Sequence, residues 1–242
     1  MLKLSVVIPV FNEAQTVEQI FAYVQAVDVD KELVIVDDFS TDGTRDILQK
    51  IQEQSDNVQI RLHDRNYGKG RALRTGFEHA RGDYVIVQDA DLEYDPEDYT
   101  KLLRPLERGQ ADAVYGSRFI STQEHRVLYF WHSVGNQFLT LLSNMTTDLN
   151  LTDMETCYKV FRRELIQAIP LEEDRFGFEP EITSKLSKAR ARIYEVGIAY
   201  HGRTYEEGKK IGMKDGFRAL WCIIKFKLQP LRLKQPWAPP SL

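Results

Sequence analysis

The sequence has few cysteines, no excess of basic residues and no long uninterrupted hydrophobic run. Its 242 residues include only Cys157 and Cys222, far apart in the chain, so we expect neither a disulfide framework nor a cysteine-based zinc site, and a reducing compartment by default. The net charge of -4, from 32 basic and 36 acidic residues, gives no reason to expect a nucleic-acid partner. These absences exclude disulfide-rich secreted domains and typical nucleic-acid-binding proteins.

Two apolar segments bear on membrane targeting. The N-terminal residues, MLKLSVVIPVFNEA, carry one basic residue and a short apolar run, without the cleavage pattern of a signal peptide. Residues 127–147 lack Asp, Glu, Lys and Arg but contain many Ser, Thr and Asn, whereas a membrane span needs about 20 predominantly apolar residues. We therefore expect a cytoplasmic protein that is soluble or bound peripherally to the cytosolic face of a membrane.

Strand-like apolar runs recur through the first half of the chain. They occupy residues 4–10, 33–36, 58–62 and 84–87, and the segments between them have the apolar spacing of helices. The first helix is expected to begin after Asn12, which is a favourable N-terminal cap, and residues 193–199 resemble a further strand. Alternating strands and helices predict an α/β protein with three layers and a mostly parallel central sheet.

Polar side chains follow each of these four strands. The segments are PVFNE (residues 9–13), DDFSTDG (37–43), HDRNYGKG (63–70) and QDADLE (88–93). Ligands of open α/β sheets bind outside the carboxyl ends of the strands, and parallel strands place those ends along one edge. We therefore expect the four segments to form a single site.

The acidic segment after the fourth strand predicts a metal site. Asp89 and Asp91 alternate along an extended segment, so both carboxylates can reach one point, and Glu93 is a further candidate ligand. Mg²⁺ and Mn²⁺ bind through carboxylate and phosphate oxygens, often with only one or two protein carboxylates. The alternative is that these acids only precede and stabilise a helix N-terminus, as we expect of Asp95 and its neighbours. Together with the other strand ends, the segment favours a metal that holds a diphosphate.

Two other nucleotide-binding classes are less well supported. Residues 68–70 resemble part of a dinucleotide-binding loop, but its third glycine is missing and the segment follows the third strand instead of the first. A nucleotidyltransferase would need a glycine-rich, basic N-terminal loop where this chain has PVFNE.

The ordered set PVFNE, DDFSTDGT, NYGKGRAL and DADLEYDP resembles the signature motifs of family 2 glycosyltransferases of the GT-A fold, particularly the polyprenyl-phosphate sugar synthases related to dolichol-phosphate mannose synthase. The resemblance spans residues 5–119 and weakens up to about residue 225. It implies a Rossmann-like GT-A domain over residues 1–211, with a nucleotide-sugar-binding half (1–116) and an acceptor-binding half (117–211). An amphipathic helix and tail (212–242), which could associate with a membrane, would follow.

The resemblance also implies roles for single residues. The nucleotide-sugar contacts would be Pro9, Phe11, Glu13, Asp38, Asn66, Gly68, Lys69, Asp89 and Ala90. Asp38 would accept a hydrogen bond from the base, Asp89 would contact ribose or sugar, and Asp91 with Glu93 would hold the metal. Glu93 stands where dolichol-phosphate mannose synthases more often have Gln, which leaves the sugar and the nucleotide open.

The acceptor is expected beside residues 118–136, RFISTQEHRVLYFWHSVGN. This segment offers Arg118, Arg126, His132 and Ser133 among aromatic residues, a mixture that suits an anionic head group with an apolar tail. The alternative for this segment is an ordinary amphipathic packing helix. Arg203 could close over the diphosphate, with a surface salt bridge as its alternative role.

The C-terminal helix and the general base also have open alternatives. The basic, Trp-bearing segment 213–228 could lie in a bilayer interface or pack on the core, because both uses have the same apolar pattern. A polyprenyl phosphate is already ionised near pH 7, because the second pKa of a phosphate monoester is about 6, so its transfer needs no strong base. A hydroxyl acceptor would need one, and Asp153 and Glu155 are the candidates.

Together with the residues, the family resemblance implies an inverting enzyme that uses Mg²⁺ or Mn²⁺ to transfer a hexose, mannose or glucose, from a GDP- or UDP-sugar to a polyprenyl or dolichyl phosphate at a membrane surface. The expected catalytic residues are Asp89, Asp91, Arg118, Arg203 and Asp153. One alternative is the same fold acting on a sugar hydroxyl or another lipid. Another is a non-catalytic nucleotide-sugar-binding subunit that regulates a membrane-protein partner.

Overall fold

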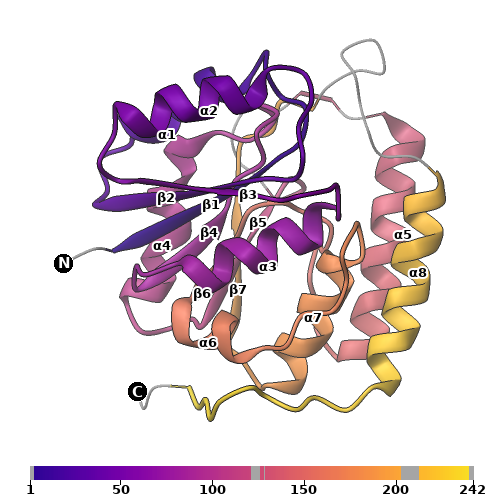
Figure 1. Cartoon of the computed structure of the whole chain (residues 1–242). Helices are drawn as coiled ribbons and strands as arrows, with labels where there is room; N and C mark the ends of the chain where they lie inside the picture. The colour runs from indigo at the N-terminus through magenta and orange to yellow at the C-terminus, as the bar shows by residue number, and fades with distance from the viewer. Residues whose placement is uncertain (1–2, 121–125, 128, 203–212, 240–242) are drawn as a thin grey trace.

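The computed structural model describes residues 3–120, 126–127, 129–202 and 213–239, and within these ranges seven strands form one sheet (Figure 1). The strand order is β3-β2-β1-β4-β6-β5-β7. All neighbouring pairs are parallel except those made by β6, which runs antiparallel to both β4 and β5. The strands are β1 (Leu4–Val10), β2 (Lys31–Asp37), β3 (Val58–Leu62), β4 (Tyr84–Val87), β5 (Ala113–Ser117), β6 (Lys159–Arg162) and β7 (Ile193–Gly197).

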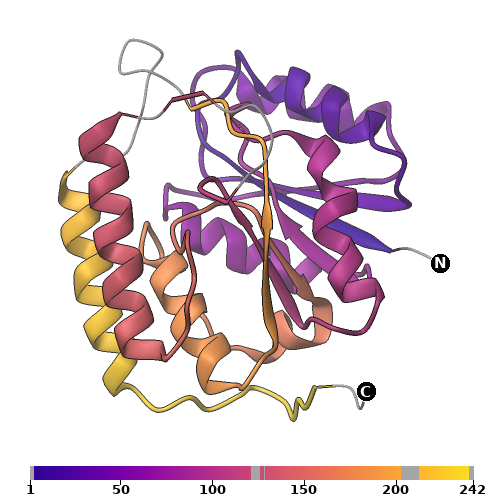
Figure 2. The ribbon, with the colours of Figure 1, turned by 180° about the vertical axis from the view of Figure 1, so that it is seen from behind.

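Helices cover both faces of the sheet and extend beyond one end of it. Seen from the two sides in Figures 1 and 2, α1, α2 and α4 lie on one face, and α3, α6 and α7 lie on the other. The remaining helices, α5 and α8, lie side by side and pack against α7. The helices are α1 (Val17–Ala26), α2 (Thr44–Glu53), α3 (Lys69–His79), α4 (Tyr99–Glu107), α5 (Phe130–Thr147), α6 (Arg163–Ala168), α7 (Phe178–Lys188) and α8 (Met213–Leu228), and a short 3₁₀ helix, Pro96–Asp98, precedes α4.

The predicted α/β architecture is confirmed, and burial explains why its central strands were recognisable. Strands β1 and β4 are covered by helices on both faces, and Val6, Val7 and Ile86 have no exposed surface. Strands buried on both faces are continuous apolar runs in the sequence. The expected strand over residues 193–199 is present as β7.

Two strands and one helix start differ from the sequence-based expectation. We did not predict β5 or β6, which are short and flank the irregular segment around α5. The helix expected after Asn12 begins only at Val17. Asn12 instead has a φ of 54°, and its side-chain oxygen accepts a hydrogen bond from the backbone amide of Thr41 at 2.9 Å. It therefore links the loops after β1 and β2 and does not cap a helix.

Helix α8 has an inner and an outer face. Ala219, Cys222, Ile223 and Phe226 are buried against the rest of the domain, whereas Trp221 and its neighbours on the other side are exposed. Within the described ranges, none of the helices combines the length and the hydrophobicity that crossing a membrane requires.

Candidate active site

A cavity of about 1030 Å³ lies at the carboxyl ends of β1, β2 and β4, and residues of α5 and α8 contribute to its opposite wall. Each residue that we expected to bind the nucleotide sugar lines this cavity: Pro9, Phe11, Glu13, Asp38, Asn66, Gly68, Lys69, Asp89 and Ala90. The metal candidates Asp91 and Glu93 line it as well, with Arg118 and His132. The four strand-end segments therefore meet in one place, as the sequence predicted.

Asp38 holds the loop between β3 and α3 in position. Its carboxylate accepts hydrogen bonds from the backbone amides of Tyr67 at 3.0 Å and Gly68 at 2.6 Å, and the His63 ring lies 2.7 Å away. Gly68 has a φ of 109°, and a Cβ atom there would lie 2.5 Å from the carbonyl oxygen of Asp174, so only glycine fits. The role of Asp38 as an acceptor for the base stays a prediction, but its carboxylate clearly shapes this wall.

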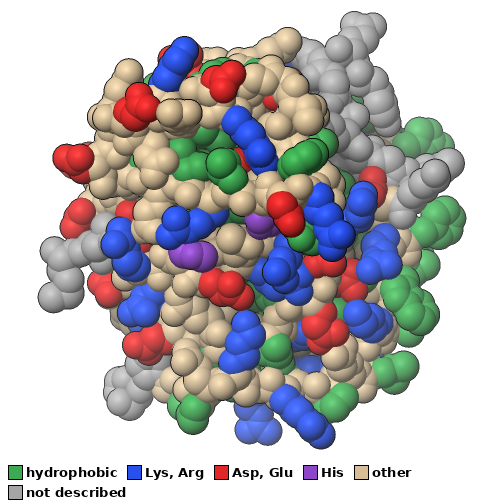
Figure 3. Space-filling model, in the orientation of Figure 1, with side chains coloured by type: hydrophobic (Ala, Val, Ile, Leu, Met, Phe, Trp, Pro, Cys, Tyr) green, Lys and Arg blue, Asp and Glu red, His purple; other side chains and the backbone are tan. Residues whose placement is uncertain are grey.

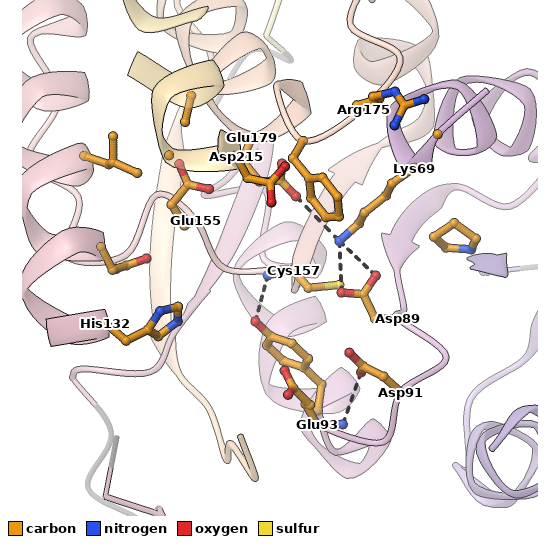
Figure 4. Close-up of a pocket in the computed structure, with 18 of the residues that line it drawn as sticks. Lys69, Asp89, Asp91, Glu93, His132, Glu155, Cys157, Arg175, Glu179 and Asp215 are labelled. Carbon is orange, nitrogen blue, oxygen red and sulfur yellow. Dashed lines mark hydrogen bonds and ion pairs between the residues drawn. The ribbon is translucent and has the colours of Figure 1, made fainter. Parts of the chain in front are cut away.

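Lys69 forms an ion pair with Asp89 and lies close to a second acid of the cavity, Glu179. Its ammonium lies 2.9 Å from both carboxylate oxygens of Asp89 and 3.6 Å from Glu179 of α7 (Figure 4). Burial disfavours the charged amine, but the nearby carboxylates outweigh this and hold the pKa of Lys69 well above its usual value. The negative charge of Asp89 is therefore compensated by a cationic partner within the protein.

Asp91 and Glu93 lie on a strained turn directly after β4. Between them, Leu92 has a φ of 63°, a left-handed conformation that a bulky residue rarely adopts. The Glu93 amide donates to the Asp91 carboxylate at 3.3 Å, and the Tyr200 hydroxyl donates to the Glu93 carboxylate at 2.8 Å. Such strain is most often retained at functional sites, where the surrounding structure maintains it.

The acids of this turn fit a divalent cation that is shared with a ligand. Asp91 and Glu93 offer hard carboxylate oxygens on the cavity wall. Among the described residues, no group of three or more His, Cys, Asp or Glu side chains is arranged to hold a metal. A cation here would need oxygens from a bound phosphate, which is the usual coordination of Mg²⁺ in nucleotide sites.

Arg118 and Asp153 form a buried ion pair behind the cavity wall. The guanidinium donates to the two Asp153 oxygens at 2.6 and 2.7 Å and to Asn136 at 3.2 Å. Asp153 has no exposed surface and does not line the cavity. A general base must reach its substrate, so the geometry assigns Asp153 to positioning Arg118, and its prediction as a base gains no support.

The other predicted acceptor residues do not all lie at the cavity. His132 lines the cavity, but Ser133 and Arg126 are not among its lining residues. Arg126 is exposed and donates to the carbonyl oxygen of Gly202 at 3.0 Å. Arg203 lies outside the described residues.

Several cavity residues were not predicted from the sequence. They are Tyr94, Cys157, Arg175, Glu179, Tyr200 and Asp215, with Phe217 and Leu220 of α8. Burial and the neighbouring Asp89 raise the pKa of the Cys157 thiol well above its usual value, so it is a poor nucleophile. The segment RFGFEPEI, which contains Glu179, was the available signal, since its similarity to the glycosyltransferases extends beyond the four main motifs.

A comparison with protein families decides the class. The family model described as Glycosyl transferase family 2 matches residues 5–169. The chain belongs to this family. It is a glycosyltransferase domain of the GT-A fold, and the seven-stranded, mostly parallel sheet agrees with that assignment.

Similar curated proteins act on polyprenyl phosphates. The chain is 28% identical over 217 residues to the undecaprenyl-phosphate 4-deoxy-4-formamido-L-arabinose transferase of Photorhabdus laumondii, covering 88% of this chain and 64% of that protein. It is 29% identical over 229 residues to the dodecaprenyl-phosphate galacturonate synthase of Rhizobium johnstonii, covering 92% and 66%. The chain thus spans less than two thirds of the length of these relatives.

Among solved structures, the chain is similar to glucosyl-3-phosphoglycerate synthase from Mycobacterium tuberculosis, which was crystallised with Mn²⁺, UDP and phosphoglyceric acid. The TM-score is 0.71 at 19% identity, covering 94% of this chain and 79% of that one. At this identity the similarity concerns the fold.

Proposed function

We propose that this domain transfers a hexose from a UDP- or GDP-sugar to a polyprenyl phosphate, with inversion and with the help of Mg²⁺ or Mn²⁺. The observation that carries the proposal is the strained turn of Asp91 and Glu93, which faces a cavity large enough for a nucleotide sugar and lined by both halves of the domain. The curated relatives, which are named for sugar transfer to polyprenyl phosphates, support this acceptor class.

Different residues of the cavity would have different roles in the reaction. Asp91 and Glu93 would hold the cation, which when bound neutralises charge on the departing nucleoside diphosphate. Lys69 keeps Asp89 paired and oriented at the end of β4, where we expect contact with ribose or sugar. An ionised acceptor phosphate attacks the anomeric carbon as the bond to the diphosphate breaks, so the protein needs to move no proton.

Arg118 is the best-placed described cation for the acceptor phosphate. It lines the cavity, is oriented by Asp153, and its guanidinium lies 5.1 Å from the centre of the Tyr200 ring. Burial lowers its pKa, but the Asp153 charge outweighs this and holds the pKa of Arg118 well above its usual value, so the group stays charged. Because Nε and Nη2 bind Asp153, the guanidinium would attract the acceptor phosphate through its fixed positive charge and its Nη1 group.

The apolar outer face of α5 and α8 favours a membrane surface as the place of reaction. Figure 3 shows hydrophobic side chains gathered along this edge of the molecule. The exposed large residues are Phe130, Trp131, Val134, Phe138, Leu141 and Met145 on α5, and Phe217, Trp221, Ile224 and Leu228 on α8. Because Trp131, Phe138 and Phe217 also line the cavity, a lipid tail could leave the site directly along this face. This arrangement supports peripheral binding to a cytosolic membrane face, where the lipid phosphate and the nucleotide sugar can meet.

The test is transfer of labelled sugar from a panel of UDP- and GDP-hexoses to polyprenyl phosphate with Mn²⁺ or Mg²⁺. We expect one donor to give lipid-linked label, and Asp91→Asn to lower its rate by roughly 10²–10³-fold, as loss of a charge-stabilising group at a reacting centre does. Glu97→Gln, which removes an exposed acid outside the cavity, is the matched control and should retain full activity. Full activity of Asp91→Asn would exclude the metal role, and transfer only to hydroxyl acceptors would exclude the lipid phosphate.

A further inference from the structure

The loop before β6 is fixed by side chains from three other parts of the fold. The Glu195 carboxylate of β7 accepts hydrogen bonds from the first two amides of the loop, and hydroxyl groups accept from two later ones. The bonds are Thr152 to Glu195 at 2.9 Å, Asp153 to Glu195 at 3.2 Å, Met154 to Thr140 of α5 at 3.1 Å, and Cys157 to Tyr94 at 3.0 Å. Glu155 lies between these anchors, so the backbone that carries it is held in place.

Glu155 lies on the cavity wall, and among the described residues one of its oxygens has no hydrogen-bond partner. It lines the cavity, and its Oε1 atom is buried and makes no hydrogen bond to any described residue. The nearby cations are engaged elsewhere: Lys69 with Asp89, Arg118 with Asp153, and Lys159 with the carbonyl oxygen of Thr156. A buried polar atom left unpaired costs about 1–3 kcal/mol, so a ligand that completes its hydrogen bonding is favoured.

We propose that Glu155 is a sugar-recognising residue, which hydrogen-bonds a hydroxyl or amide group of an uncharged donor sugar. This inference rests on the proposed function, with the base expected at Asp38 after β2 and the diphosphate beside Asp91 after β4. The donor sugar then extends toward the residues contributed by the second half of the chain. In the view of Figure 4, Glu155 lies on that side, between His132 and Asp215, and away from Asp91.

The protonation state of Glu155 agrees with this role. Burial, followed by the charge of Glu179, raises the pKa of Glu155 to about 8, although Lys159 and Arg118 oppose the shift. At neutral pH the group is thus mainly the neutral acid, which can donate one hydrogen bond and accept others. The charged and titratable groups around it are Asp153 on its own loop, Arg118 after β5, Lys159 on β6, His132 on α5, Glu179 on α7 and Asp215 on α8.

The same surroundings disfavour a negatively charged sugar. Glu179 and Asp215 line the cavity with Glu155, and Lys69 already neutralises Asp89. The carboxylate of a uronic acid near Glu155 would add a negative charge where the charge of Glu179 already acts, and like charges in a partly buried site repel. A sugar that carries only hydroxyl or amide groups meets no such repulsion.

The experiment measures binding to the full chain in the absence of acceptor, so that only the donor is tested. Calorimetric titrations with Mn²⁺ compare UDP with UDP-glucose, and GDP with GDP-mannose, because the difference within a pair isolates the contribution of the sugar. We expect Glu155→Ala to weaken binding of the nucleotide sugar by about tenfold, a typical effect of one buried hydrogen bond, and to leave the nucleoside diphosphate unchanged. Glu155→Gln, which imitates the neutral acid, should stay within about threefold of the unaltered protein.

The pH dependence provides an independent readout. In the unaltered protein, the ratio of the affinity for the nucleotide sugar to the affinity for the nucleoside diphosphate should fall between pH 7 and pH 9. Glu155 loses its proton in this range, around its pKa of about 8. In Glu155→Gln, the affinity ratio should not change over this pH range. UDP-glucuronate should bind the unaltered protein more weakly than UDP-glucose.

Several outcomes would overturn the inference. Unchanged nucleotide-sugar binding in Glu155→Ala would exclude a contact with the donor sugar, and equal damage in Glu155→Gln and Glu155→Ala would mean that the ionised form is the active one. Binding of UDP or GDP serves as the test of folding in each variant. If the unaltered protein binds neither diphosphate with Mn²⁺, the proposed function fails together with the inference, whereas a failure confined to Glu155 leaves that function standing.

Discussion

The two halves of the domain use their charged residues differently. In the first half, Asp91 lies on a strained turn at the edge of the sheet and faces the cavity, where a ligand can reach it. In the second half, Asp153 and Lys159 have no exposed surface, and Asp153 is fully engaged by Arg118. Asp91 thus presents its charge to a ligand, whereas Asp153 uses buried charge to hold the protein itself in place, as Asp38 does in the first half.

This difference follows from how each half is built. The parallel strands β1 to β4 gain stability from continuous apolar packing, so their polar ends are available for binding. The second half inserts the antiparallel strand β6 and connects it through the irregular loop that contains Asp153 and Glu155. Such a loop needs internal partners for its polar groups, because buried charges are tolerated only when they are paired and hydrogen-bonded.

The largest effect is expected from breaking the buried pair. Asp153→Asn keeps the shape of the side chain but leaves the guanidinium of Arg118 buried without a counter-charge. Removing one partner of a buried ion pair typically costs about 3–5 kcal/mol, so urea unfolding should show a loss of that size. In Asp91→Asn, where the acid is half-buried on the cavity wall and not in the packed interior, the free energy of unfolding should change by less than about 0.5 kcal/mol. Equal stability of the two variants would contradict the comparison.

A smaller effect is expected where the two halves meet. A Cβ atom on Gly70, in the first turn of α3, would lie 2.3 Å from the carbonyl oxygen of Glu173, so Gly70→Ala should force backbone to move at a cost of about 1–3 kcal/mol. Gly135 on α5 is a matched control, because it is exposed and a Cβ atom there meets nothing within 4 Å. Gly135→Ala should stabilise the protein by about 0.5–1 kcal/mol in the same urea titration. A neutral Gly70→Ala would mean that the two halves can shift apart without cost.

The comparison also explains which features the sequence could reveal. The first half was predictable because its strands are unbroken apolar runs and its site residues follow those strands directly, as Asp38 and Asp91 do. Strands β5 and β6 were missed although β4 is no longer than either, because AVYGS and KVFR are not continuous apolar runs and β6 pairs with strands distant in sequence. No local pattern in a sequence carries that kind of pairing information.

The roles of single residues also depend on contacts that the sequence alone does not reveal. The position of Asn12 matched a helix cap, but the contact with Thr41 depends on the neighbouring strand β2 and not on the following helix. Asp153 and Glu155 were equivalent candidates for a base until the fold placed one behind Arg118 and the other on the cavity wall. Burial separates these two acids, and burial is a property of the packed molecule.

The smallest expected effect concerns the outer face of α5, in the second half, and of the C-terminal helix α8, which distinguishes both helices from the first half in their relation to the membrane. Phe217 and Trp221 are exposed by 71% and 58%, so replacing both with Ser should disturb the fold little. If this face enters a bilayer interface, the double variant should partition to anionic lipid vesicles roughly tenfold or more weakly than the unaltered protein. The reason is the lost apolar area, since full burial of one aromatic side chain contributes about 1.5–3 kcal/mol. Tyr23→Ser on α1, an exposed aromatic of the first half, is the matched control and should leave vesicle binding unchanged. Equal binding of all three proteins in a flotation assay would place the membrane contact elsewhere, and the apolar face would then need a protein partner to cover it.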